Sequence, residues 1–161
     1  MASKQKNLSS YSNINMASVA NKRFALLVSE WNEEVTESLY AGAFQTLIEH
    51  GVDKGNIIKQ YVPGSFELSL GAQLMAQDKK IDAVICLGCV IQGETRHFDF
   101  ICDAVANGLT SVALKFNKPV IFGVLTTGNQ KQALDRAGGK HGNKGDEAAV
   151  TAIKMLSLCQ S

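Results

Sequence analysis

The sequence predicts a single α/β domain, a three-layer sandwich in which a parallel sheet of about four strands is flanked by helices. Short apolar runs alternate with longer stretches of helical periodicity, which is typical of successive βα units. The apolar runs are continuous, as expected for strands that helices cover on both faces. A length of 161 residues with no internal repeat or linker fits one domain.

The first half of the chain supplies two strand–helix units. Residues 24–28 are continuously apolar and form the first predicted strand. Apolar side chains then recur at helical spacing over residues 33–50, with Asn32 as the expected N-cap. The second strand covers residues 57–62 and ends at a Pro-Gly pair, after which Ser65 is placed to cap a helix running to about residue 77.

The second half repeats the pattern twice and adds a final helix. Strands are predicted over residues 83–90 and 120–125, separated by a helix over residues 97–116. Two helices follow, over residues 129–137 and 146–158, because a glycine-rich stretch interrupts the periodicity between them. Since all four strands are joined through helices, the sheet is expected to be parallel.

Residues 1–20 differ in composition from the domain that follows over residues 21–161. They are rich in Ser and Asn, contain no acidic residue and lack the apolar core of a secretory signal. We expect a flexible N-terminal arm on a cytoplasmic protein. The whole chain carries 16 Lys and Arg against 15 Asp and Glu, so no basic field favours nucleic acid. Apolar runs stay well short of the roughly 20 residues that cross a membrane.

The four cysteines are predicted to be reduced thiols, since a domain of this size needs no disulfide staples. Cys86 and Cys89 have the spacing of a redox or metal-binding pair. Both fall in the strand predicted over residues 83–90, however, where positions three apart point to opposite faces. We therefore expect no metal site here.

The loops after the four strands are the expected place for a ligand, because parallel sheets bind ligands at the carboxyl ends of their strands. These loops carry chemically useful side chains. They cover residues 29–32, 63–67, 91–97 and 126–129.

Two features of the third loop suggest chemistry. Glu94 and Thr95 precede a helix whose N-terminus could hold a phosphate, although an ordinary helix start capped by Thr95 is the preferred interpretation of this loop taken alone. His97 begins the same helix, where an imidazole could transfer protons. His50 and His141 lack such a setting, His50 at a helix end and His141 in a glycine-rich loop.

Aromatic and cationic residues complete the candidates. Trp31 follows the first strand and could stack on a planar heterocycle, as could Phe66, while Glu67 could accept hydrogen bonds from a polyol or a ring N–H. Arg136 and Lys144 belong to the clearest cationic cluster of the chain, and arginine suits phosphate. Core packing or a solvated charged face are the ordinary alternatives.

Five segments in order along the chain resemble the lumazine synthase family. The resemblance extends from about residue 23 to residue 156. It rests on Trp31-Asn32 and on residues 62–67, 87–98, 122–127 and 136–145.

The resemblance implies a flavodoxin-like sheet and a step of riboflavin synthesis. The family condenses 5-amino-6-(D-ribitylamino)uracil with 3,4-dihydroxy-2-butanone 4-phosphate to give 6,7-dimethyl-8-ribityllumazine and phosphate, with no metal or redox cofactor. Trp31 matches the ring-stacking position, where the family usually has Phe. The segment that matches the ribityl-binding positions is Ser65, Phe66 and Glu67. Cys89, Val90 and Ile91 match substrate-binding positions, the last two against the ring.

The same resemblance assigns the phosphate and the proton chemistry. Glu94 and Thr95 match the phosphate-binding turn, Arg136 is its cationic and catalytic partner, and His97 matches the proton-transfer residue. Phe122, Arg136 and Lys144 would come from a neighbouring subunit. The resemblance further implies a homopentamer, which we expect to form a sixty-subunit icosahedral shell, with riboflavin synthase as a candidate partner.

Two other classes of protein share some of these features. A flavodoxin-like binding module would also have a parallel sheet and a stacking aromatic, but the acidic loop after the first strand differs from its hydroxyl-rich phosphate loop. A purely structural shell protein would explain an oligomer, yet it would not need His97, Arg136 and Glu67 together.

Overall fold

A four-stranded parallel sheet with the order β2-β1-β3-β4 forms the centre of the computed structural model, which describes residues 19–158. The strands are β1 (Phe24–Ser29), β2 (Ile57–Val62), β3 (Ala83–Ile91) and β4 (Val120–Thr127). β1 pairs with β2 on one side and with β3 on the other. The chain therefore reverses its direction of travel across the sheet between β1 and β3, and such a switch point opens a crevice at the strand ends.

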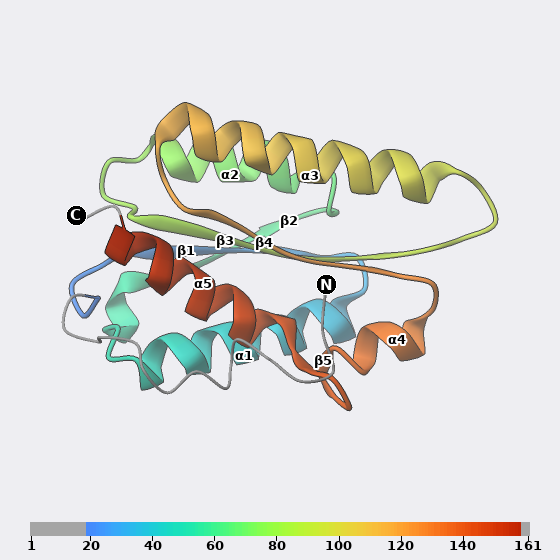
Figure 1. The fold of residues 1–161 in the computed structure, drawn as a ribbon, viewed down its shortest axis with the longest axis horizontal. Helices are drawn as coiled ribbons and strands as arrows, with labels where there is room; N and C mark the ends of the chain where they lie inside the picture. The colour runs from blue at the N-terminus through green and yellow to red at the C-terminus, as the bar shows by residue number, and fades with distance from the viewer. Residues whose placement is uncertain (1–18, 159–161) are drawn as a thin grey trace.

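Helices cover both faces of the sheet (Figure 1). One layer contains α2 (Leu68–Gln77) and α3 (His97–Phe116), and the other contains α1 (Glu33–Glu49) and α5 (Lys144–Leu158). The short η2 (Lys54–Asn56) precedes β2, and α4 (Gln130–Leu134) follows β4. A small hairpin of β5 (Ala137–Gly139) and β6 (Gly142–Asn143) leads into α5.

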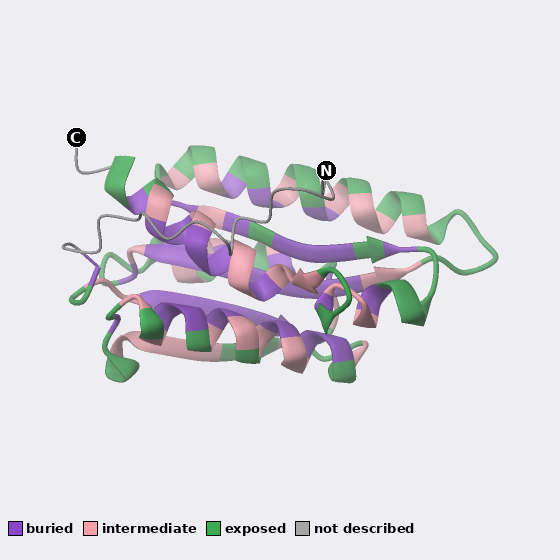
Figure 2. Ribbon diagram, turned by 60° about the horizontal axis from the view of Figure 1, so that its bottom comes forward, coloured by how far each residue is buried: buried purple, intermediate pink, exposed green. Residues whose placement is uncertain are grey.

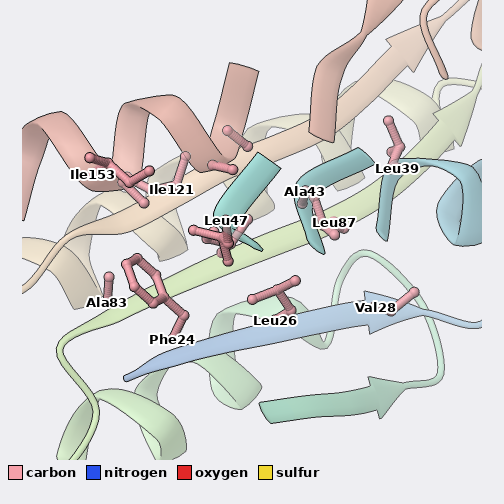
Figure 3. Close-up of a cluster of buried hydrophobic side chains, with 14 of the residues drawn as sticks. Phe24, Leu26, Val28, Leu39, Ala43, Leu47, Ala83, Leu87, Ile121 and Ile153 are labelled. Carbon is pink, nitrogen blue, oxygen red and sulfur yellow. The ribbon is translucent and has the colours of Figure 1, made fainter. Parts of the chain in front are cut away.

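The two faces of the sheet bury separate apolar clusters. Phe24, Leu26 and Val28 point from β1 into the cluster under α1 and α5, which Figure 3 shows with Leu47 and Ile153. The alternate residues of β1 pack into the cluster under α2 and α3. Because both faces are covered, β1 is buried along its whole length, while the edge strand β2 is partly exposed (Figure 2).

The structure confirms the predicted fold class and all four parallel strands. The predicted helix over residues 129–137 was too long: the chain turns after Leu134 and forms the hairpin that sequence reasoning treated as a loop. The last helix also begins at Lys144, two residues before the predicted start. A two-residue strand such as β6 is too short to show apolar periodicity, so sequence patterns cannot predict it.

Asn32 takes the predicted position before α1, but neither of the two predicted side chains caps its helix. Asn32 precedes α1 but has a left-handed conformation with φ 62°, and its side chain forms no cap. α2 begins at Leu68 rather than beside Ser65, and the Ser65 hydroxyl has no hydrogen-bond partner. Both side chains instead lie at the carboxyl end of the sheet, where tertiary contacts determine their orientation.

The N-terminal part of the described chain packs against the domain. Val19 is buried, and the Ala20 carbonyl accepts hydrogen bonds from the Asp53 backbone and from Asn56 Nδ2. Residues 1–18 of the predicted arm, and Cys159, lie outside the described residues. Within residues 19–158, no helix combines the length and the apolar character needed to cross a bilayer.

Candidate active site

A crevice of about 700 Å³ opens at the carboxyl ends of β1, β2 and β3, where the strand order predicts a ligand site. The loops after β1 and β2, the end of β3 and the first turns of α3 surround it. Its lining residues are Trp31, Asn32, Gly64, Ser65, Phe66, Glu67, Cys89, Val90, Ile91, His97 and Ile101. Eight of the residues predicted for the site therefore lie together.

Two aromatic side chains at this crevice are exposed to an extent that is unusual for their size. Trp31 is 74% exposed and Phe66 is 55% exposed. Tryptophan and phenylalanine normally bury most of their surface in a core. Their exposure beside an apolar crevice is what a site for a planar heterocycle requires.

The loop after β2 is fixed by its own acidic residue. Glu67 Oε2 accepts a hydrogen bond of 3.0 Å from the Gly64 backbone N–H. A Cβ at Gly64 would lie 3.1 Å from that carboxylate oxygen and 3.4 Å from the Trp31 ring, so glycine lets loop and indole approach each other. Glu67 keeps its other oxygen for a donor in the crevice.

Asn32 is a crevice residue to which sequence reasoning gave only the role of a helix cap. Its Nδ2 donates a 2.9 Å hydrogen bond to the Cys89 carbonyl, which joins the loop after β1 to the end of β3. The left-handed backbone at Asn32 turns the side chain toward β3 rather than toward α1. The residue type, which tolerates this conformation, was the only signal in the sequence.

His97 begins α3 and lines the crevice, whereas Glu94 and Thr95 lie on the exposed loop before it and are not among the lining residues. The His97 backbone N–H donates to Thr95 Oγ1 over 3.4 Å, so Thr95 caps the helix only through a long hydrogen bond. At the same end of the helix, the N–H groups of Asp99 and Phe100 both donate to the Arg96 carbonyl.

The two cysteines of β3 point to opposite faces of the sheet, as predicted. Cys89 packs with the α1–α5 layer and Cys86 with the α2–α3 layer. Burial raises the pKa of the Cys89 thiol to about 11 and raises that of Cys86 further. Both thiols are therefore protonated and unreactive near neutral pH. Among the described residues, no group of three His, Cys, Asp or Glu side chains could hold a metal ion.

A second, polar pocket of about 280 Å³ lies between β4, α4 and the start of α5. Arg136 and Lys144 line it, as do Thr127, His141 and Glu147. Lys144 Nζ lies 2.7 Å from Glu147 Oε2, so that cation is already partly neutralised. Arg136 Nη1 donates to the Gln132 carbonyl at 3.1 Å and leaves its remaining N–H groups available to the pocket.

Three outcomes at this pocket differ from sequence reasoning. The sequence pattern indicates no functional setting for His141. The β5–β6 hairpin folds back so that the His141 backbone N–H donates to the Asp135 carbonyl at 2.7 Å. His141 thereby lines the same pocket as Arg136 and Lys144. Phe122 lies on the edge strand β4, 39% exposed, and lines neither pocket. Gln132 and Glu147 had no motif that could have identified them, whereas Thr127 lies in the predicted loop over residues 126–129 and in the segment 122–127 that resembles the family.

Comparison with known proteins assigns a family to this arrangement. Residues 21–160 match the family model described as 6,7-dimethyl-8-ribityllumazine synthase. The 6,7-dimethyl-8-ribityllumazine synthase of Cytophaga hutchinsonii is 67% identical over 157 residues, covering 98% of each chain. That of Flavobacterium johnsoniae is 51% identical over 99% of this chain and 84% of its own. That of Parabacteroides distasonis is 50% identical over 98% of this chain and 99% of its own. The chain therefore belongs to the 6,7-dimethyl-8-ribityllumazine synthase family.

Proposed function

We propose that this chain condenses 5-amino-6-(D-ribitylamino)uracil with 3,4-dihydroxy-2-butanone 4-phosphate at active sites shared between neighbouring subunits. Family membership makes the chain a transferase of riboflavin biosynthesis. The observation that carries the shared site is that one chain has an aromatic crevice and a cationic pocket lined by different residues. A crevice from one subunit and a cationic surface from the next supply complementary halves.

The aminouracil occupies the aromatic crevice. Trp31 stacks on the pyrimidine ring, Val90 and Ile91 contact the ring with Cys89 beside them, and the ribityl chain lies along residues 65–67. The exposure of Trp31 and Phe66 supports this assignment, as does the free carboxylate oxygen of Glu67. Stacking suits a planar ring, and a carboxylate that accepts hydrogen bonds suits a polyol.

The phosphate of the second substrate binds at the N-terminus of α3, at Glu94 and Thr95, and is clamped by Arg136 of the neighbouring subunit. Phe122 and Lys144 come from that same neighbour. Unpaired N–H groups and the helix dipole favour an anion at such a terminus. Arg136 has donors to spare, whereas Lys144 shares its charge with Glu147.

Proton transfer and orientation account for the chemistry. The substrate amine attacks the ketone to form an imine with loss of water, phosphate leaves, and ring closure with loss of a second water gives the lumazine. These steps move protons but need no strong protein nucleophile. His97 transfers protons at the mouth of the crevice, and holding the two substrates side by side supplies much of the acceleration.

The subunits assemble as homopentamers, and twelve pentamers form an icosahedral shell in the cytoplasm. Large apolar side chains on the outer layer of helices support an interface, because monomeric proteins rarely expose several of them together. They are Leu70 and Leu74 on α2 and Phe100 and Leu114 on α3. Riboflavin synthase is the candidate partner of the shell. Sedimentation at working concentration tests the assembly, and a monomer would refute it.

Mixed oligomers test the shared site. His97→Ala and Arg136→Ala subunits are each prepared alone and then co-assembled in equal amounts, with both substrates present and lumazine fluorescence as the readout. If the two residues meet across an interface, about a quarter of the interfaces in the mixture pair an intact His97 with an intact Arg136. We expect activity to recover to that fraction of wild type. A mixture no more active than either parent would place both residues in one chain, and a wild-type protein that forms no lumazine would refute the activity itself.

A further inference from the structure

Beneath the crevice, two serine hydroxyls lie against the same glycine. Ser29 ends β1, Ser65 lies in the loop after β2, and Gly88 is in β3, on the other side of β1 from β2. A Cβ at Gly88 would lie 2.6 Å from Ser65 Oγ and 3.4 Å from Ser29 Oγ. The missing side chain of Gly88 therefore makes the room that both hydroxyls occupy.

Neither hydroxyl has a hydrogen-bond partner among the described residues. Ser29 is fully buried and Ser65 is 6% exposed. Buried hydroxyls without partners are costly and uncommon, so two of them at one point call for an explanation. The third atom close to that Cβ position is apolar, because Leu68 Cδ1 would lie 2.9 Å from it.

The two serines differ in what they reach. Ser65 lines the crevice, whereas Ser29 does not. The Ser29 backbone is held in place, because its carbonyl accepts a 2.8 Å hydrogen bond from Thr36 Oγ1 and the next N–H, that of Glu30, donates to the Val62 carbonyl. The Ser29 backbone is thus fixed, and its buried hydroxyl lies against the same glycine as the hydroxyl of Ser65, which lines the crevice.

We propose that Ser29 is a positioning residue for Ser65: in the loaded site its hydroxyl donates to Ser65 Oγ, and the Ser65 hydrogen is thereby directed at a hydroxyl of the polyol chain. The inference rests on the proposed function, because it needs a polyol in this part of the crevice. A hydroxyl both donates and accepts, so the pair forms a short relay from β1 to the substrate. Gly88 is the residue that makes this contact possible.

Substitutions at the pair test the relay through steady-state kinetics. Ser29→Ala is expected to raise the KM for the aminouracil about fivefold and to leave kcat within about a factor of two. Because Ser29 acts through Ser65, the double variant Ser29→Ala/Ser65→Ala should be no worse than Ser65→Ala alone. A double variant whose KM equals the product of the two single effects would overturn the proposal.

Ser69→Ala is the matched control. Its hydroxyl is also buried without a partner, but it lies on α2 against Gly108 of α3 and does not line the crevice. We expect no change in KM for this variant. An effect as large as that of Ser29→Ala would mean that loss of any buried hydroxyl near α2 produces it, and the proposal would be wrong.

An aminouracil without the ribityl chain separates positioning from a general loss of structure. Its equilibrium affinity should be the same for wild type and Ser29→Ala, while the affinity for the ribityl compound falls about fivefold. Gly88→Ala adds a Cβ that crowds Ser65 Oγ, so this variant should also lose affinity for the ribityl compound and not for the compound without the ribityl chain. It replaces Ser29→Ala in the test if Ser29→Ala does not fold. Equal losses for both ligands would overturn the relay. Wild-type protein that binds neither compound would instead refute the proposed function.

Discussion

The crevice and the cationic pocket are built by opposite means, although both lie at the same edge of one sheet. The crevice is large, mostly apolar and formed by three strand ends, with two exposed aromatic rings. The pocket is less than half that volume and is lined by Arg136, His141, Lys144 and Glu147, which come from the turn after α4, the β5–β6 hairpin and the start of α5. One region is suited to a flat ring and the other to an anion. Neither region alone suits both substrates, which is why we propose that they meet across subunits.

The largest effect is expected in the cationic pocket. Arg136→Ala removes the arginine that we propose to clamp the phosphate and should lower kcat/KM about 10²- to 10³-fold, as loss of one charge-stabilising donor does in other active sites. Initial rates at varied phosphorylated ketone, with inorganic phosphate as a competing inhibitor, measure it. Lys140→Ala is the control, since Lys140 is an exposed cation of the same hairpin and does not line the pocket. Similar losses in both variants would show that only the net charge of the hairpin matters.

In the crevice, the largest effect is expected at its mouth. His97→Ala should bind both substrates and turn them over about 10²-fold more slowly, because it removes the proton-transfer group and leaves the stacking surface intact. Single-turnover fluorescence separates the two steps. His50→Ala is the control, because His50 Nδ1 lies 2.7 Å from the Thr46 carbonyl at the end of α1, away from both pockets. An unchanged kcat for His97→Ala would remove the histidine from the mechanism.

The apolar character of the crevice can be measured through Cys89. Burial raises the pKa of this thiol from 9.0 to about 11, so at pH 8 its thiolate fraction should be about 100-fold below that of an unperturbed thiol. Iodoacetamide labelling followed by mass spectrometry should show this ratio between native and guanidine-unfolded protein. The native rate should keep rising with pH up to about pH 11. Equal labelling rates of Cys89 in native and unfolded protein would mean that water reaches this thiol freely in the crevice.

The smallest effect is expected from the stacking ring. Trp31→Ala should raise the KM for the aminouracil about 3- to 10-fold, the usual contribution of an aromatic pair beyond its buried area. Trp31→Phe keeps a ring and should recover most of that loss. The KM for the phosphorylated ketone should not change, because it depends on the other pocket. A Trp31→Phe variant as impaired as Trp31→Ala would argue against stacking.

The sheet could be predicted from the sequence because its strands are apolar on both faces. Residues 24–28 are all apolar, without the alternation of apolar and polar residues that marks a strand exposed on one face. Each following helix has a clear apolar face. The rule that ligands bind at strand ends then predicts that Trp31, Glu67 and His97 lie at one crevice, and all three line it in the structure.

What could not be predicted depends on contacts between distant parts of the chain. Asn32 is a residue type that is common at helix N-caps. Its side-chain amide, however, donates to the Cys89 carbonyl, 57 residues away in the sequence. His141 looks isolated in a glycine-rich stretch until the hairpin folds back against Asp135. Ser65 resembles a cap because local patterns show a hydroxyl before a helix and cannot show the glycine of β3 beside it.

The bond between Asn32 and Cys89 also bears on how long a subunit survives. This hydrogen bond forms only when β3 lies beside β1, so a ligand that binds in the crevice, as we propose, would bind the folded sheet and not a partly folded form. By mass action, occupancy then adds to the free energy that opposes unfolding. Subunits that hold substrate should unfold less often, and proteases should therefore degrade them more slowly than empty subunits. The supply of substrate would then set the degradation rate of the protein as well as its catalytic rate.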